Sequence, residues 1–513
     1  MPTEITHLAI EPKGVDGVAV HASGDTSRAP DSNTNDVAFS VYIHANDRLV
    51  TEEEKLRVRR KVDLYLMPWV VLGFLQYLDK SAISYAALYN LQEDLGMTSS
   101  QFSWTSSAFY FGTLIWQYPS LMLLQRFHVG RYFASQVLGW GAISFLMAAS
   151  SNFGGFFALR FLLGAFECVQ MPAFVLITSM YYTREEQPLR MLFWYGTNGI
   201  AIIAGGLFAY GVGHINSSIP LWKYPFLICG ALSVAWSAVL FLALPANPST
   251  AWFLTPAERE IAIKHVENNQ TGIESKVFKK EQAIEALTDP KVILAAFGAG
   301  VGNILSGLNV FGTLVIRGFG FTVLQTTLLQ CPTGLVEIIA MIAFTLGATY
   351  IPNSRVILSS IATAVALVGT IILYAFSLDH RWVLIVGLLI CTRIWLAGGF
   401  IPSSFILGQG LNASNIAGHT KKVTAQGFIF VIYAAGSIVG PQLYNSPPYR
   451  QGLRANFVAL SILLLLNMAS FFYLCFENRR RQQYREAHPE LQMSEYLFRD
   501  LTDKQNPFCV NKI

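Results

Sequence analysis

Charged side chains are scarce in this chain. Asp, Glu, Lys and Arg make up 13% of its 513 residues, about half of the roughly 25% that is typical of soluble proteins. Of these 68 charges, 44 lie in residues 1–61, 245–291 and 477–513, so the other 368 residues carry only 24. So few charges cannot cover the surface of a water-soluble globule. The composition therefore excludes a soluble enzyme and a soluble nucleic-acid-binding protein, and it indicates that lipid solvates most of the chain.

Several other features are missing. The six cysteines are scattered and no two have metal-ligand spacing, which excludes a disulfide framework and predicts free thiols. Residues 1–61 hold no apolar run long enough for a signal-peptide core. No P-loop, His-Glu-x-x-His or nucleophile-elbow motif is present. We therefore expect no enzyme activity, no metal and no cofactor, and the net charge of +4 is too small to indicate a nucleic acid partner.

Apolar runs of about 20 residues, each long enough to cross a bilayer as a helix, recur along the chain instead. There are twelve, at residues 63–86, 103–124, 131–150, 153–178, 190–212, 222–244, 291–316, 326–349, 355–377, 381–407, 422–444 and 453–476. The sequence therefore predicts an all-α membrane protein with twelve transmembrane helices in two six-helix bundles. The predicted parts are a polar tail (1–61), an N-terminal bundle (62–245), a linker with a surface helix (246–290), a C-terminal bundle (291–476) and a second tail (477–513).

Basic residues are concentrated in alternate loops. The residues just before the first run and the loops after the second, fourth and tenth runs carry Lys or Arg, whereas residues 86–102 and 213–221 carry none. Because basic loops stay in the cytoplasm, this pattern predicts that both termini are cytoplasmic. Arg317, Arg381 and Arg450 fall on the predicted outer side and weaken the pattern without reversing it.

Two local patterns concern the linker and the relation between the halves. Thr255-Pro256-Ala257-Glu258 is typical of a helix start, with Thr255 as N-cap and Glu258 completing a capping box. The stretch that begins Arg160-Phe-Leu-Leu-Gly in the fourth run resembles Arg393-Ile-Trp-Leu-Ala-Gly in the tenth, and the fifth and eleventh runs are both rich in small residues. These matches favour two related bundles.

Ionisable residues lie well inside the first and fourth runs, where each costs at least about 2.5 kcal/mol unless it is paired or hydrated. Asp79 and Lys80 are adjacent, and Arg160 and Glu167 are seven residues apart. Seven residues are about 20° short of two helical turns, so Arg160 and Glu167 point the same way, about 10.5 Å apart along the axis. Gly164 lies between them and leaves room for a ligand or a neighbouring helix.

This arrangement suits the joint transport of an anion and a proton. Arg160 stays charged and offers a bidentate site for a carboxylate. Glu167 competes for that charge when it is ionised, and burial favours its neutral, protonated form, which leaves Arg160 free for the substrate. Asp79 beside Lys80 repeats the arrangement. The alternative interpretation is that these residues form ion pairs that join the two helices.

Other candidates for the cavity lining are Glu337 in the eighth run, Arg393 in the tenth, Tyr85 and Asn198. Arg393 is the counterpart of Arg160 if the halves repeat, and Glu337 is its candidate partner. Asn216-Ser217-Ser218 is a glycosylation sequon on the predicted outer side, in a loop short enough to disfavour modification.

Motifs at many points of the chain resemble the major facilitator superfamily, and in it the anion:cation symporter branch and the fungal allantoate permease family. Tyr77-Leu78-Asp79-Lys80 resembles the branch's Tyr-x-Asp-Arg/Lys motif, and Arg160 to Glu167 resembles Arg-Phe-x-x-Gly-x-x-Glu. Further similar stretches are Pro172, Tyr181 to Arg190, Trp222 to Phe226, Leu244-Pro245, Ala251 to Thr255, Asn415 to Lys421 and Gly440-Pro441-Gln442. The order and spacing of the set make the resemblance specific over nearly the whole length.

The resemblance implies a proton-driven importer of organic anions. By the same resemblance, Asp79 and Glu167 carry protons, Lys80 and Arg160 contact the substrate carboxylate, and Tyr77 lies nearby. Two departures stand out. In the loop that holds Gln125, Arg126 and Arg131, Gln125 replaces the superfamily's usual acidic residue, so this inner gate is held differently. Ala82, followed by Tyr85, replaces an asparagine that is frequent in the branch, which indicates a changed contact in the cavity.

We therefore expect a proton-coupled symporter of a small carboxylate that works by alternating access. It is expected to act as a monomer, with the anion, protons and the lipid bilayer as its partners and no nucleic acid. It is expected to lie in the plasma membrane, with the vacuolar membrane as the alternative. A proton-antiport exporter of a specialised metabolite is a second hypothesis, although the fifth run lacks the proline of drug antiporters. A nutrient sensor that no longer transports is a third.

Overall fold

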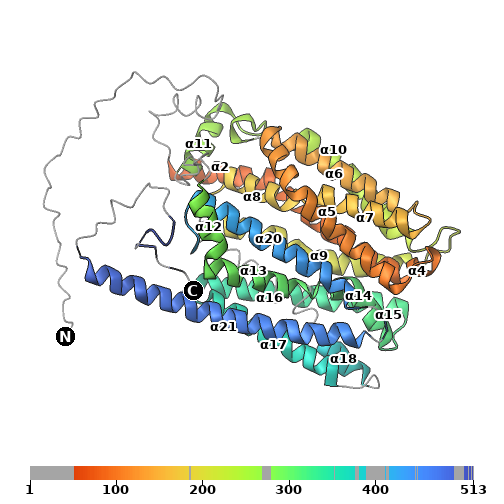
Figure 1. Cartoon of the computed structure of the whole chain (residues 1–513). Coiled ribbons are helices and arrows are strands. Elements are labelled where there is room, and N and C mark those ends of the chain that lie inside the picture. The colour runs from red at the N-terminus through yellow and green to blue at the C-terminus, as the bar shows by residue number, and fades with distance from the viewer. Residues whose placement is uncertain are drawn as a thin grey trace, which may run out of the picture. The chain divides into compact units, whose positions relative to one another are not determined.

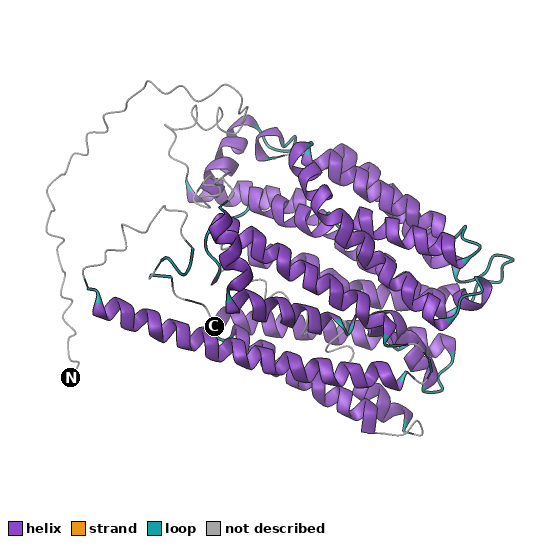
Figure 2. Ribbon diagram, in the orientation of Figure 1, coloured by secondary structure: helices purple, strands orange, loops and turns teal. Residues whose placement is uncertain are grey.

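The computed structural model describes residues 51–183, 186–245, 247–267, 279–351, 353–375, 380–388, 411, 415–444, 446–447, 449–489, 502–506, 508–509 and 511, all in one unit, Arg48–Ile513. The regular structure of these residues is entirely helical (Figure 2). Helices α11 (Pro256–Glu267) and α12 (Lys280–Thr288) lie at one end of the long helices (Figure 1). We call this end, which is the one predicted to be cytoplasmic, the inner end, and the opposite one the outer end.

The helices before α11 form the first half of this unit. They are α2 (Glu52–Leu66), η1 (Met67–Val70), α3 (Val71–Leu88), α4 (Leu91–Asp94), α5 (Ser99–Arg126), α6 (Val129–Met147), α7 (Phe153–Glu167), α8 (Gln170–Tyr181), α9 (Gln187–Val212), α10 (Lys223–Ala243) and η2 (Pro248–Thr250). Each of the six predicted spans of this half therefore corresponds to one helix or to consecutive helices.

The helices after α12 form the second half. They are α13 (Pro290–Asn303), α14 (Ser306–Gly318), α15 (Val323–Leu328), α16 (Gln330–Tyr350), α17 (Arg355–Ala375), α18 (Arg381–Leu388), α20 (His419–Gln442) and α21 (Arg450–Ala487). The predicted span 381–407 is described only as far as residue 388. Helix α21 continues past residue 476, where the last predicted span ends, and so carries basic residues of the predicted tail on an extended helix.

Prolines interrupt two of the predicted spans. The span predicted at 153–178 consists of α7 and α8, which meet at Cys168 and Val169. Pro172 cannot donate a hydrogen bond to the carbonyl group of residue 168 and its ring crowds that group, which explains the break directly after Glu167. Pro68 lies in η1 for the same reason, so the helix that carries Asp79 begins at Val71 and not at residue 63.

Helix packing follows the same plan in both halves. In the first half, α6 packs on α10, α3 on α9 and α3 on α10. In the second, α17 packs on α21, α13 and α14 on α20, and α13 on α21. These are the pairs formed by the third and sixth, first and fifth, and first and sixth spans of each half. Helices α5 with α20 and α9 with α16 then join the halves, again as equivalent pairs. This repetition supports the hypothesis of two related bundles.

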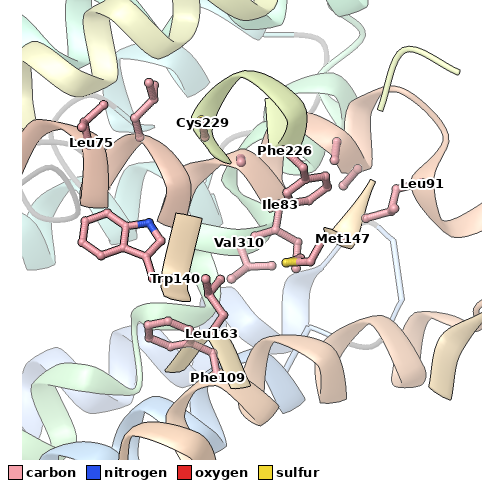
Figure 3. Packing of buried hydrophobic residues seen from close by; sticks show 14 of the residues in the cluster. Leu75, Ile83, Leu91, Phe109, Trp140, Met147, Leu163, Phe226, Cys229 and Val310 are labelled. Carbon is pink, nitrogen blue, oxygen red and sulfur yellow. The ribbon is translucent and has the colours of Figure 1, made fainter. Parts of the chain in front are cut away.

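Apolar side chains hold the first half together and reach into the second. Trp140 of α6, Leu163 of α7 and Phe226 of α10 are each 1% exposed and belong to one cluster (Figure 3). Val310 of α14 belongs to the same cluster, so the second half packs against it directly. Close packing of this kind fixes the relative positions of α3 and α7, which carry the charged residues of the predicted site.

Not every span is apolar enough to be recognised by composition. Among the described residues, seven helical segments are long and apolar enough to cross a membrane by length and composition alone. Helix α5 is excluded because it carries a run of small polar residues, of which Ser103, Thr105, Ser106 and Ser107 are at most 1% exposed. Since these residues face the protein interior and not the lipid, the low hydropathy of α5 reflects its central position between the halves.

The inner end carries the linker and part of the C-terminal segment. The predicted capping box is confirmed: Thr255 N donates to Glu258 Oε2 at 2.9 Å, and Glu258 N donates to Thr255 Oγ1 at 3.3 Å. Asp503, 2% exposed, binds Lys291 and also Lys421, whose Nζ lies 2.7 Å from Asp503 Oδ1. The C-terminal segment is therefore attached to the start of the second bundle by buried ion pairs.

Candidate functional site

Helices α3 and α7 bring three of the predicted charged residues together inside the first half. Asp79 is 1% exposed, Arg160 3% and Glu167 2%. Arg160 interacts electrostatically with both carboxyl groups. None of the three faces the lipid, as the sequence predicted. They are, however, more enclosed than residues that line an open cleft, because α5 packs directly over α7.

Arg160 has unused capacity to donate hydrogen bonds. Its Nε donates to the Thr105 carbonyl oxygen at 3.5 Å, the limit of a hydrogen bond. Its guanidinium carbon lies 5.4 Å from the centroid of the Phe109 ring, which is within the range of a cation–π contact. Nη1 is buried without a hydrogen-bond partner among the described residues. A buried guanidinium with an open donor is suited to bind an anion.

Each of the two carboxyl groups beside Arg160 has one oxygen that accepts a hydrogen bond and one that does not. Ser144 Oγ donates to Asp79 Oδ1, and Gln76 Nε2 donates to Glu167 Oε2 at 3.3 Å. Asp79 Oδ2 and Glu167 Oε1 are buried without a donor among the described residues. The two carboxyl groups also interact electrostatically with each other. A proton on either group would supply a hydrogen-bond donor, which neither carboxyl group has when both are ionised.

Lys80 lies on the side of the site that faces the second half. Its Nζ is 5.5 Å from the centroid of the Tyr110 ring, and it interacts electrostatically with Tyr77, Glu167 and Tyr433. Tyr433 belongs to α20 of the second half. Lys80 and Tyr77 are partly exposed, unlike the three enclosed residues. They are therefore less enclosed than Asp79, Arg160 and Glu167.

Gly164 marks a close approach of two helices. A Cβ atom at this position would lie 1.9 Å from the Phe109 carbonyl oxygen, and one at Gly112 would lie 1.9 Å from the Phe161 carbonyl oxygen. Thr113 Oγ1 also donates to the Gly164 carbonyl oxygen at 3.2 Å. Of the two possibilities for the room left by Gly164, the structure therefore shows the neighbouring helix, α5. This contact presses Phe109 against Arg160.

The other candidates for the cavity lie outside this cluster. Tyr85 is 3% exposed and packs against Gly205 of α9, and Asn198 is partly exposed on the same helix. Glu337 is 1% exposed in α16, which crosses α9. Arg393 lies outside the described residues. The pairing of Glu337 with Arg393 therefore stays a prediction.

The loop predicted to act as the inner gate leaves its arginines at the surface. Arg126 and Arg131 are exposed, and His128 accepts a hydrogen bond from Arg131 N at 3.4 Å. The side chain of Gln125 lies outside the described part of the structure. Asn216 of the glycosylation sequon is exposed, between α9 and α10. The gating role and the modification stay predictions.

Ion pairs that the sequence did not predict lie at the inner end near the start of α9. Arg190 Nη2 lies 2.9 Å from Asp63 Oδ2, and Arg59 Nη1 lies 2.9 Å from Glu186 Oε1. His265 Nε2 lies 2.9 Å from Glu186 Oε2. Burial alone would raise the pKa of Glu186, but hydrogen bonds from His265 and Arg59 lower it to about 2. These pairs join α2, α9 and α11 across long separations in the sequence.

Several residues of the site were not among the candidates predicted from the sequence. Ser144 and Gln76 each hold one of the carboxyl groups. Gln76 could have been found, because it lies four residues before Lys80, a spacing that puts both on one side of a helix. Ser144 and Tyr433 carry no such signal, since their positions depend on how α6 and α20 pack against α3.

The two halves also meet near the outer end. Ser84 and Thr313 are joined by hydroxyl groups 2.9 Å apart, and Ser107 Oγ donates to the Ile438 carbonyl oxygen at 2.8 Å. A depression of about 540 Å³ opens there between the halves, with Glu93 and Arg317 in its lining. Ala87, at its rim, lies eight residues or about 12 Å beyond Asp79 along α3. The depression is therefore separate from the charged cluster.

Comparison with known proteins shows which family the chain matches and which transporters it is similar to. Residues 69–441 match the family model described as Major Facilitator Superfamily. The chain is 39% identical to the uncharacterized transporter C460.05 of Schizosaccharomyces pombe, over 92% of this chain and 89% of that protein. It is 31% identical to the allantoate permease of Saccharomyces cerevisiae, over 93% of this chain and 90% of that protein.

Solved structures agree on the fold. The xylose transporter XylE from Escherichia coli superposes with a TM-score of 0.58 at 11% identity, covering 80% of this chain and 96% of XylE. At this identity the similarity concerns the fold alone. Together with the family match, it confirms the predicted fold class of twelve membrane helices in two bundles. The orientation of the termini stays a prediction.

Proposed function

Since the chain belongs to the major facilitator superfamily and is a multi-pass membrane transporter, not an enzyme, we propose that it carries a small organic anion together with protons. One observation supports this proposal above the others. Arg160 is enclosed with an open donor, next to two carboxyl groups that each have one oxygen without a donor among the described residues. A permanent cation is therefore balanced by groups that protonation can neutralise.

The coupling follows from competition for Arg160. When Glu167 and Asp79 are both ionised, they satisfy the charge of the guanidinium, and a substrate carboxylate gains little by approaching it. When a proton is bound between them, one negative charge is removed and Arg160 attracts the substrate carboxylate more strongly. Protonation and anion binding therefore favour each other, which is the thermodynamic requirement for symport.

Lys80, Tyr77 and Tyr433 provide the route to this cluster. Lys80 is partly exposed and interacts with Tyr433 of the second half, so an anion between the halves meets Lys80 first. The Phe109 ring covers Arg160. We infer that the substrate carboxylate approaches Lys80 and displaces Phe109 to reach the guanidinium.

Alternating access requires the contacts at the outer end to break and re-form. The Ser84–Thr313 and Ser107–Ile438 hydrogen bonds join the halves in the present conformation. We propose that they form the outer gate, and that Arg126, Arg131 and Gln125 belong to the inner one. Hydrogen bonds between neutral groups suit a gate because each contributes only about 1 kcal/mol and is easily exchanged for water.

The similarity to a yeast allantoate permease favours a carboxylate as substrate and the plasma membrane as the location. Uptake should be measured in a deletion strain, with a panel of labelled carboxylates headed by allantoate. An importer coupled to protons alkalinises the medium when it receives its substrate. Accumulation inside inverted vesicles would indicate an antiport exporter instead, and the absence of both would indicate a sensor.

Variants of Arg160 test the site itself. Arg160→Ala should abolish substrate binding, and Arg160→Lys should retain only part of it because a lysine cannot form the bidentate contact. Arg480→Ala is the control, since Arg480 is 73% exposed at the end of α21. Normal transport by Arg160→Ala would show that the site lies elsewhere.

A further inference from the structure

Helix α2 has two faces that differ in their contacts. Its buried face consists of Val58, Val62 and Leu66, which pack in a cluster with Phe253 and Ile261 of the linker. Two of its charged residues are used in the same docking: Lys61 Nζ lies 2.7 Å from Glu258 Oε2, and Arg59 pairs with Glu186. This face fixes α2 against the inner end of the first half.

The opposite face of α2 is exposed. Leu56, Arg57, Arg60 and Leu64 fall within an arc of about 100° on a helical projection. Leu64 is 70% exposed and Leu56 is 39% exposed, and both arginines are exposed. Neither Arg57 nor Arg60 forms an ion pair with any described residue. The arc therefore combines unpaired positive charge with exposed apolar surface.

Two aromatic residues lie beside this face, on the side where α2 contacts the linker. Tyr65 is 38% exposed and its ring centroid is 5.3 Å from that of Trp252, which is 57% exposed. The Trp252 indole donates to the Ala243 carbonyl oxygen at the end of α10. Trp and Tyr prefer the boundary between lipid tails and water. Their position next to the ends of α3 and α10 places α2 at that boundary.

We propose that the face formed by Leu56, Arg57, Arg60 and Leu64 binds the anionic phospholipid headgroups of the leaflet at the inner end. The order of the residues agrees with this occupant. Leu64 is nearest to α3, where the acyl chains begin, Arg60 and Arg57 lie one and two turns farther along, and the acidic Glu53 is at the far end of the helix. A basic amphipathic helix at the lipid surface is attracted to negatively charged headgroups. The proposal does not depend on which solute the protein carries.

The experiment uses the purified full chain in nanodiscs of phosphatidylcholine with increasing phosphatidylserine. The apparent melting temperature of the wild type should rise with phosphatidylserine content, and the rise should shrink in high salt because the interaction is electrostatic. Arg57→Gln/Arg60→Gln should need at least about fivefold more phosphatidylserine for the same rise. Arg57→Lys/Arg60→Lys should behave as the wild type, since the charge is kept.

Two further variants make the result specific. Lys280→Gln removes an exposed charge from α12 and should leave the response unchanged. Leu64→Glu places a negative charge on the exposed face without touching the core, and should reduce the response. Soluble phosphoserine should have no effect, since a lipid surface and not a free anion is bound. The proposal is overturned if phosphatidylserine leaves the wild type unchanged, or if Arg57→Gln/Arg60→Gln responds as the wild type does.

Discussion

Replacing Gly164 by alanine should separate α5 from α7 at the centre of the site. The new Cβ atom would lie 1.9 Å from the Phe109 carbonyl oxygen, and this neighbour is backbone and cannot rotate away. The helices must therefore move apart by at least about 1 Å, and overpacking of this kind costs about 1–3 kcal/mol or more. The same movement takes Phe109 and Thr105 away from Arg160, so transport should fall together with stability.

The assay is thermal unfolding of the purified protein, combined with uptake. Gly427→Ala is a matched control, because no atom lies within 4 Å of the new Cβ position in α20. Because Gly427 lies in the middle of a helix, its replacement by alanine should stabilise the protein by about 0.5–1 kcal/mol. Gly164→Ala should therefore melt well below the wild type, and Gly427→Ala at or above it. Equal melting temperatures for the two variants would refute the close packing of α5 on α7.

Three more predictions concern the rest of the molecule. Asp503→Asn should lower the free energy of unfolding by about 3–5 kcal/mol, and the melting temperature with it, because it leaves Lys291 and Lys421 buried with fewer negative partners; unchanged unfolding would show that the C-terminal segment adds no stability. Cysteines at Ser84 and Thr313 should form a disulfide that stops transport and is reversed by reduction, because it locks the outer gate; continued transport by the cross-linked protein would contradict that role. The lowered pKa of Glu186, about 2 in the folded protein against 4.5 for an ordinary glutamate, means that its pairing stabilises α2 above about pH 4.5 and that this stability is lost as the pH falls toward 2. The difference in melting temperature between wild type and Glu186→Gln should shrink over that interval, and a constant difference would contradict it.

Much of the fold could be predicted from the sequence because each membrane helix must bury its own backbone polar groups and show an apolar surface to the lipid. The number and order of the spans follow from this requirement alone. The breaks were harder to predict. Pro172 could have indicated that α7 ends near Glu167, but an apolar run continues through it. The sequence therefore predicted one helix where the structure has two.

Only the parts of the site that lie on a single helix could be predicted from the sequence. Helical geometry put Arg160 and Glu167 on one side of α7, and both side chains are buried, although the sequence led us to expect them in the lining of a cavity. The residues that complete the site, Ser144 and Tyr433, come from other helices. Their positions depend on how α6 and α20 pack against α3, which a single sequence does not specify.

The contacts at the inner end could be predicted only where they join residues that are close in the sequence. The linker cap between Thr255 and Glu258 was predicted because it lies within four consecutive residues. The pair between Lys421 and Asp503 joins residues 82 positions apart. The linker was therefore recognised as a surface helix, while the attachment of the C-terminal segment was not.

Glu167→Gln in proteoliposomes tests the central claim most directly. Glutamine keeps the shape of the glutamate side chain and the hydrogen-bonding geometry, but it cannot exchange a proton. The variant should still exchange labelled substrate across the membrane at equal pH on both sides, and it should fail to accumulate substrate against a concentration gradient when a pH gradient is imposed. Accumulation at the wild-type level by Glu167→Gln would contradict the account.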